Sequence, residues 1–255
     1  MPMTRKFIPS LFTVLNAFCG FLSVIHSSNG DFTNAALFII YASLFDAVDG
    51  IAARLTNSAS KFGVELDSLS DVISFGAAPS FLIYSIYLKE LGDIGIVLSS
   101  FLMIFSALRL ARFNVQLVGL DKEKFSGLPA PMSAFTICTF VLFYFDKILS
   151  HEQSITVLIV LAVLLPFLMV SRIKYDTFPK PSLASIRKNF IPYFVIALAA
   201  VLIIVTGGEG SFSFCLFYIF SGIFKTIKNK LFRRKKHHES DDVLSESIET
   251  GKKSI

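Results

Sequence analysis

The stretch from Asp46 to Asp71 reads DAVDGIAARLTNSASKFGVELDSLSD and lies where two hydrophobic segments meet, each long enough to span a bilayer. Asp46 and Asp49 are three residues apart, and Asp67 and Asp71 are four apart, so each pair shares one face of a helix. An aspartate near the middle of a spanning helix costs about 2.5–3.5 kcal/mol on insertion scales, so such residues usually have a function and face away from lipid. We therefore expect two facing helices to bring the four carboxylates to one pocket.

Carboxylates gathered in this way repel one another unless a cation lies between them. A site with only oxygen ligands suits a hard divalent ion such as Mg²⁺ or Mn²⁺. Two other interpretations are a structural polar network between helices and the ion path of an ion-coupled transporter. A transporter predicts inverted repeats, and the later hydrophobic segments contain no second copy of the D-G-x₂-A-R pattern. The sequence thus favours a metal site.

The rest of the chain is typical of an all-α, polytopic integral membrane protein. Of its 255 residues, 53% are hydrophobic, with 28 Phe and no Trp, and long uncharged runs recur along it. Because backbone polar groups must be satisfied internally in lipid, these runs predict a bundle of about eight transmembrane helices. The predicted spans cover residues 8–27, 33–54, 65–87, 93–112, 129–147, 154–171, 190–207 and 211–226.

The distribution of basic residues predicts the orientation of the bundle. With eight spans, all but Lys89 and Lys147 of the 24 Lys and Arg residues fall on the same side. Loops rich in Lys and Arg face the cytoplasm, so we expect both termini to be cytoplasmic. The expected location is the cell (inner or cytoplasmic) membrane, with the aspartates just below its cytoplasmic surface.

The sequence predicts two regions of different character. Residues 1–226 form the membrane-embedded domain, and residues 227–255 form a charged cytoplasmic tail. The basic part of the tail is expected to lie against anionic lipid headgroups, each basic residue contributing about 1 kcal/mol, rather than to bind nucleic acid. The acidic part has little apolar content and is expected to be disordered.

The full pattern around the aspartates is D-x₂-D-G-x₂-A-R-x₈-G-x₃-D-x₃-D, in which Gly50, Ala53, Arg54 and Gly63 occupy the other fixed positions. It resembles the signature of the CDP-alcohol phosphotransferase family, integral membrane enzymes of phospholipid synthesis, and departs from it at no fixed position. The resemblance implies a six-helix core, here with two further helices, and a homodimer.

The resemblance also implies the roles of these residues. Two divalent ions are expected, with the metal ligands Asp46, Asp49, Asp67 and Asp71. Such an ion pair clamps the attacking and leaving oxygens of a phosphoryl transfer, and Asp71 is expected to be the catalytic general base. The residues expected to bind the CDP-lipid are Gly50, Ala53, Arg54, Ser60 and Gly63.

Segments beyond the motif narrow the choice of acceptor alcohol. Similarity to the serine-using, metal-dependent members of the family extends over residues 71–80, 107–114, 125–131 and 169–175. It implies transfer of a phosphatidyl group from CDP-diacylglycerol to the hydroxyl of L-serine, with release of CMP. The alternative acceptors are glycerol 3-phosphate and inositol phosphate. No histidine begins an H-x-K pattern, so we expect direct in-line attack rather than a covalent phosphohistidine.

Three residues are candidates for binding the acceptor. Arg109 and Arg112 lie three apart near the cytoplasmic end of a predicted span, where either can receive the carboxylate of serine. The alternative is that both are ordinary interfacial anchors that follow the positive-inside rule. Asn114 is the third candidate.

Overall fold

The computed structural model describes residues 3–56, 60–118, 127–173, 175 and 205–228, and these residues contain helices but no strand. The all-α prediction is thereby confirmed for this part of the chain. The labelled elements are α1 (Met3–Ser28), α2 (Phe32–Thr56), α3 (Lys61–Asp71), η1 (Val72–Ala77), α4 (Ala78–Ile86), η2 (Leu88–Leu91), α5 (Asp93–Val118), α6 (Ala130–Phe143) and α7 (His151–Val170). A further helix follows at 210–228.

Six helices in this part of the chain are long and apolar enough to cross a membrane, at residues 11–28, 32–52, 62–86, 93–115, 151–170 and 210–228. They match six of the predicted spans within a few residues. Helix α6 coincides with a seventh but is shorter, with 14 residues. The predicted span at 190–207 lies almost entirely outside the described residues, as does most of the tail at 227–255. The total of eight spans remains a prediction.

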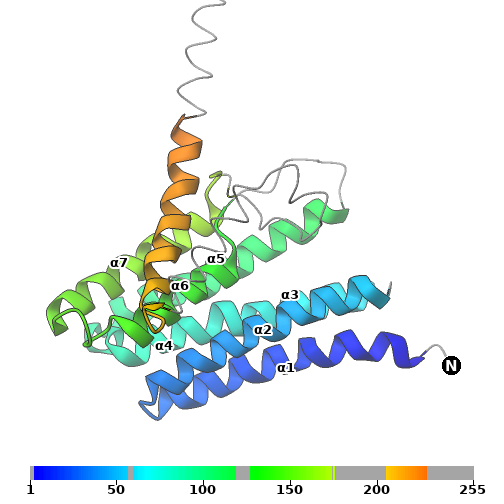
Figure 1. The fold of residues 1–255 in the computed structure, drawn as a ribbon, viewed down its shortest axis with the longest axis horizontal. Helices are drawn as coiled ribbons and strands as arrows, with labels where there is room; N and C mark the ends of the chain where they lie inside the picture. Colours follow the sequence, from blue (N-terminus) through cyan, green and yellow to red (C-terminus); the bar gives the residue numbers. More distant parts are fainter. Residues whose placement is uncertain (1–2, 57–59, 119–126, 174, 176–204, 229–255) are drawn as a thin grey trace, which may run out of the picture.

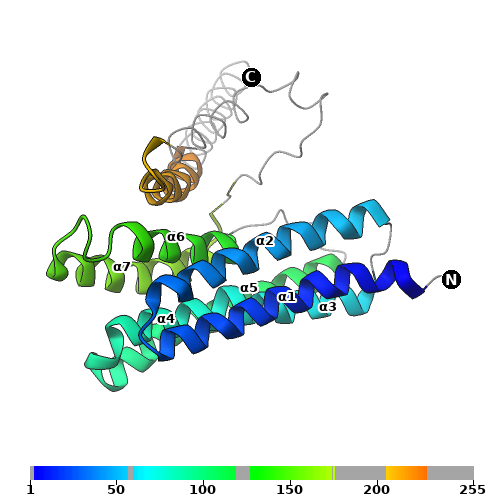
Figure 2. The same cartoon turned by 60° about the horizontal axis from the view of Figure 1, so that its bottom comes forward.

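The helix α1, the helix α2, the continuous helix from α3 through η1 to α4, and the helix α5 form a bundle in which each runs opposite to the one before it (Figures 1 and 2). The beginning of α1, the end of α2, the beginning of α3 and the end of α5 lie at one end of this bundle. The connections at 29–31 and 87–92 lie at the other end. Figure 1 shows the helix at 210–228 rising steeply from the bundle rather than running along it.

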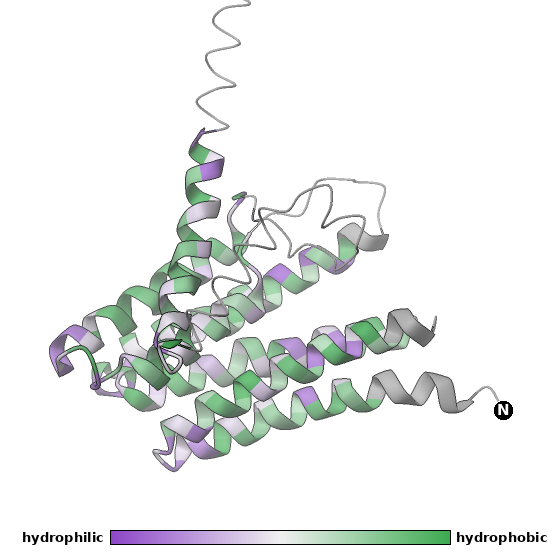
Figure 3. Cartoon of the chain, in the orientation of Figure 1, coloured by the Kyte–Doolittle hydropathy of each residue, from purple (hydrophilic) through white to green (hydrophobic). Residues whose placement is uncertain are grey.

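The polarity of α1 is reversed relative to that of a helix in a soluble protein. Its outward face carries large apolar side chains, among them Phe18 and Phe21, which are 52% and 55% exposed. Its inward face carries small or polar residues, namely Thr13, Asn16, Gly20, Ser23 and Ser27. Figure 3 shows apolar residues along every helix, with polar ones interrupting them near the candidate site. Lipid suits the outward face, and small side chains let membrane helices approach closely.

A π-helical segment, η1, separates α3 from α4. Gly76 and Pro79, residues that often interrupt a helix, fall within the predicted span 65–87, but the helix continues through them and widens. The amide of Ala78 donates to the carbonyl of Ile73, five residues earlier, as a π-helix requires. Pro79 has no N–H to donate, and such a residue is tolerated in a membrane helix when local π geometry accommodates it. Because η1 begins directly after Asp71, it sets the direction in which the last turn of α3 faces.

Candidate active site

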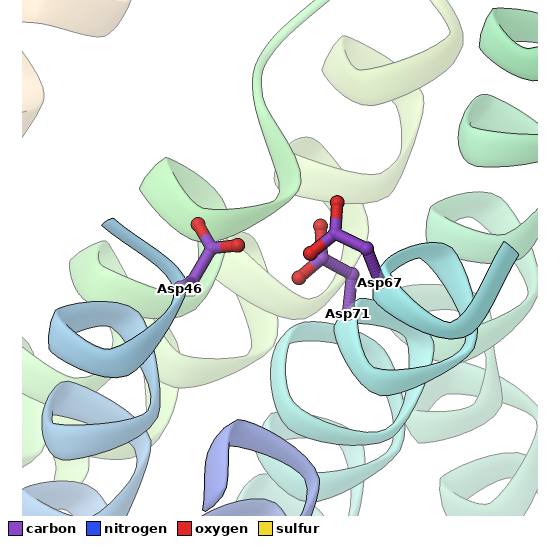
Figure 4. Close-up of side chains that lie close together, drawn as sticks. All are labelled: Asp46, Asp67 and Asp71. Carbon is purple, nitrogen blue, oxygen red and sulfur yellow. The ribbon is translucent and has the colours of Figure 1, made fainter. Parts of the chain in front are cut away.

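Three of the four aspartates converge between α2 and α3. Figure 4 shows Asp46 pointing from α2 towards Asp67 and Asp71 on α3. One carboxylate oxygen of each residue lies within 4.8 Å of those of the other two. Asp71 is the most enclosed, with 9% of its surface exposed. The predicted facing of two helices is therefore observed for these three residues.

The three carboxylates fit a divalent metal ion. Two oxygens that bind one Mg²⁺ at about 2.1 Å lie at most about 4.2 Å apart, so small side-chain rotations bring all three onto one ion. A cation held by the three oxygens would offset the repulsion between them.

The fourth aspartate, Asp49, lies beside this group but is not part of it. It interacts electrostatically with Asp46 and Asp67. Its Oδ2 accepts a hydrogen bond from the hydroxyl of Thr13 on α1. Asp49 is buried, with 7% of its surface exposed. Its expected role as a metal ligand stays a prediction.

Helix α1 also contacts Asp71. The side-chain amide of Asn16 donates to Oδ1 of Asp71 at 3.3 Å. One turn beyond Asp71, the hydroxyl of Ser74 donates to the backbone carbonyl of Asn16 at 2.8 Å. Sequence analysis did not identify Thr13 or Asn16 as functional. The available signal was their spacing of three residues within a predicted span that is otherwise mostly apolar.

The residues expected to bind the CDP-lipid lie on α2 and at the start of α3, and their role in binding stays a prediction. Gly50 is exposed, and a Cβ placed there would meet nothing within 4 Å, so the helix is open to a ligand. The hydroxyl of Ser60 caps α3 by accepting from the amide of Gly63 at 3.0 Å. Ala53 and Arg54 belong to the last turns of α2, but their side chains lie outside the described part of the chain.

The two candidate arginines differ in their surroundings. Arg109 is buried, with 8% of its surface exposed, and interacts electrostatically with Asp71. Arg112 is exposed. Arg109 is therefore the arginine that points towards the carboxylates, which sequence reasoning had left open between the two.

Asn114 is engaged by α3. Its side-chain amide donates to the hydroxyl of Ser68 at 2.9 Å, immediately after Asp67 in the chain. This contact ties α5 to α3, the helix that carries Asp67 and Asp71. Whether Asn114 also binds the acceptor stays a prediction.

Comparison with known proteins agrees with this geometry. The sequence model of the CDP-alcohol phosphatidyltransferase family matches residues 6–170, which include α1 to α7 and all four aspartates. The chain belongs to the CDP-alcohol phosphatidyltransferase family. The family resemblance inferred from the motif is thereby confirmed.

Several relatives within the CDP-alcohol phosphatidyltransferase family carry names that specify serine. A CDP-diacylglycerol–serine O-phosphatidyltransferase of Helicobacter pylori is 34% identical over 226 residues, covering 88% of this chain and 93% of the relative. One of Bacillus subtilis is 36% identical over 175 residues, covering 69% and 93%. An archaetidylserine synthase of Methanothermobacter thermautotrophicus is 40% identical over 170 residues, covering 66% and 69%.

Proposed function

We propose that the protein transfers the phosphatidyl group of CDP-diacylglycerol to the hydroxyl of L-serine and releases CMP. The convergence of Asp46, Asp67 and Asp71 within 4.8 Å carries this proposal, because it provides a site for the charge neutralisation that a pyrophosphate reaction requires. The names of the similar proteins from Helicobacter pylori and Bacillus subtilis support serine as the acceptor.

The reaction begins with the serine hydroxyl near Asp71. The serine oxygen attacks the phosphorus that carries the diacylglycerol, and the bond from that phosphorus to the oxygen of CMP breaks. Asp71 takes the proton of the attacking hydroxyl. When bound to the aspartates, two divalent ions, Mg²⁺ or Mn²⁺, supply positive charge for the attacking and leaving oxygens. Asp46 on α2 and Asp67 on α3 would bind the ions from facing helices. We expect Asp49 to be a further ligand.

Recognition of serine is assigned to Arg109. Its buried guanidinium lies near Asp71, so it can bind the serine carboxylate while the hydroxyl faces the base. A planar guanidinium binds a carboxylate through two parallel hydrogen bonds. An anionic acceptor such as glycerol 3-phosphate or inositol phosphate would need more positive charge at this place.

We further propose that the site faces the cytoplasm. Asp46 lies in the second half of α2, and Asp67 and Asp71 lie in the first half of the continuous helix from α3 to α4, so the carboxylates lie towards the end of the bundle where α2 ends and α3 begins. Arg54, near the end of α2, and Lys61, at the start of α3, flank the connection between them, and basic residues gather on the cytoplasmic side of membranes. A nucleotide from water and acyl chains from the bilayer both reach a site at this depth.

The decisive experiment measures CMP release from CDP-diacylglycerol by purified protein with Mn²⁺ or Mg²⁺. L-Serine, glycerol 3-phosphate and inositol phosphate are supplied in separate reactions, and Asp71→Asn is assayed beside the unmodified protein. We expect release that depends on serine and metal and that is lost in Asp71→Asn. CMP release with another alcohol but not with serine would show that this other alcohol is the acceptor. No release with any alcohol, from protein that elutes as a single species, would refute the proposal.

A further inference from the structure

Asn16 lies at the centre of α1 with its side chain entirely buried. Its Nδ2 donates to Oδ1 of Asp71, while its own Oδ1 is buried without a hydrogen-bond partner among the described residues. A buried unpaired acceptor costs about 1–3 kcal/mol. If position 16 served only for packing, leucine would give a more stable protein than asparagine, because leucine has a similar volume and no polar atom to bury. The cost of Asn16 therefore needs a compensating role.

The backbone around Asn16 is held in place by η1. The hydroxyl of Ser74 donates to the Asn16 carbonyl at 2.8 Å. One turn along α1, Gly20 lies against the same serine, since a Cβ at position 20 would be 2.9 Å from the Ser74 Cα. Asp71 and Ser74 share a face of their helix, as do Asn16 and Gly20. Two contacts one turn apart thus set where the Asn16 amide stands relative to Asp71.

We propose that Asn16 is a positioning residue for Asp71. Its amide binds Oδ1 of Asp71 and fixes the rotation of that carboxylate, which leaves Oδ2 for the metal or for the proton of the acceptor alcohol. Partners that orient metal ligands in this way typically contribute about 10- to 100-fold to metal affinity or activity. The role assigned to Asn16 in catalysis rests on the proposed function of Asp71, whereas its effect on metal binding does not.

The test compares Asn16→Leu with a matched control, Ser23→Ala. Ser23 lies on the same face of α1, is fully buried, and belongs to neither the carboxylate group nor its hydrogen-bond partners. Mn²⁺ affinity is measured by electron paramagnetic resonance in detergent without substrate, and kcat and KM for L-serine are measured separately. We expect Asn16→Leu to weaken Mn²⁺ binding and lower kcat, each by about 10- to 100-fold, with a smaller change in KM. Ser23→Ala should change none of these values.

A double-mutant cycle separates positioning from general disruption. If Asn16 acts through Asp71, Asn16→Leu should cause no further loss of Mn²⁺ affinity once Asp71→Asn is present. A structural defect would instead lower the affinity equally in both backgrounds, and that result would overturn the proposal. Unchanged Mn²⁺ affinity in folded Asn16→Leu would overturn it as well.

Two further arrangements keep the outcome clear. If Asn16→Leu does not purify as a single species, Asn16→Ala removes the same amide without adding bulk and enters the same cycle. If the unmodified protein releases no CMP with serine, the proposed function fails, but the Mn²⁺ titrations still decide whether Asn16 positions Asp71.

Discussion

Gly20 of α1 lies so close to Ser74 of η1 that a Cβ at position 20 would come within 2.5 Å of the serine hydroxyl oxygen. The absence of a side chain there allows the two helices to meet almost backbone to backbone. In lipid, such close approach replaces the hydrophobic driving force that packs helices in water. Because Ser74 follows Asp71 by one turn, this contact helps to determine where the Asp71 carboxylate lies.

Gly20→Ala is expected to separate α1 from η1. The added methyl meets the Cα of Ser74 at 2.9 Å as well as its hydroxyl, and the backbone cannot turn away as a flexible side chain would. Overpacking of this kind costs about 1–3 kcal/mol. We expect a lower temperature of unfolding in detergent and weaker Mn²⁺ binding. The comparison is Gly76→Ala, whose Cβ would lie 3.2 Å from Ser106. Equal stability of the two variants would contradict the close contact at Gly20.

Gly50→Ala should leave the fold unchanged and impair the use of CDP-diacylglycerol. A Cβ at Gly50 meets no atom of the protein within 4 Å, so any loss must come from a bound ligand. We expect an unchanged temperature of unfolding and a KM for CDP-diacylglycerol that rises further in Gly50→Leu. The KM for serine serves as the internal control. If both variants use CDP-diacylglycerol normally, the nucleotide does not approach α2 at this residue.

Removal of the metal should abolish activity reversibly. A chelator withdraws the ion that balances Asp46, Asp67 and Asp71, and added Mg²⁺ or Mn²⁺ should restore CMP release. Asp46→Asn is expected to weaken Mn²⁺ binding by at least about 10-fold, since it removes one of the three ligands. Asp31→Asn is the matched control.

Asp31 lies at the opposite end of the bundle, where it accepts a hydrogen bond from the backbone amide of Asn34 at the start of α2. Asparagine caps a helix as well as aspartate does, so the substitution keeps the cap while it removes the charge that faces His26. If Asp31→Asn loses as much Mn²⁺ affinity as Asp46→Asn, the ion does not bind between α2 and α3.

The orientation of the chain can be tested with introduced cysteines. The three native cysteines, Cys19, Cys138 and Cys215, are all buried. Glu90 is exposed in the turn η2, on the side predicted to face away from the cytoplasm. A membrane-impermeant maleimide should label Glu90→Cys in intact cells. It should label Ser254→Cys, which lies in the tail predicted to be cytoplasmic, only after permeabilisation. The reverse pattern would place the candidate site on the outer face.

Much of this protein follows from local features of the chain. Hydrophobic runs predicted the helices within a few residues because lipid leaves the backbone no other way to pair its polar groups. The motif indicated the family because it resembles the family signature at every fixed position. Its spacing of three or four residues also predicted that each pair of carboxylates shares one helix face, wherever that helix lies. The effect of Pro79 on the helix was not predictable from the sequence. A proline has no N–H to donate, and either a widened π turn or a break in the helix can accommodate it. In the structure the helix widens, and Gly76 in the π-helical segment packs closely against Ser106 of α5.

The sequence by itself determined that the chain is a helical membrane protein with a carboxylate site between two neighbouring segments. Only the tertiary structure decided which side chains meet there. It grouped Asp46 with Asp67 and Asp71, and it placed Asp49 in a hydrogen bond with Thr13. It buried Arg109, which interacts electrostatically with Asp71, and left Arg112 exposed. It also brought Asn16 to Asp71. The physical reason is that residue spacing sets the face of one helix, whereas the neighbour of that face depends on how all the helices pack.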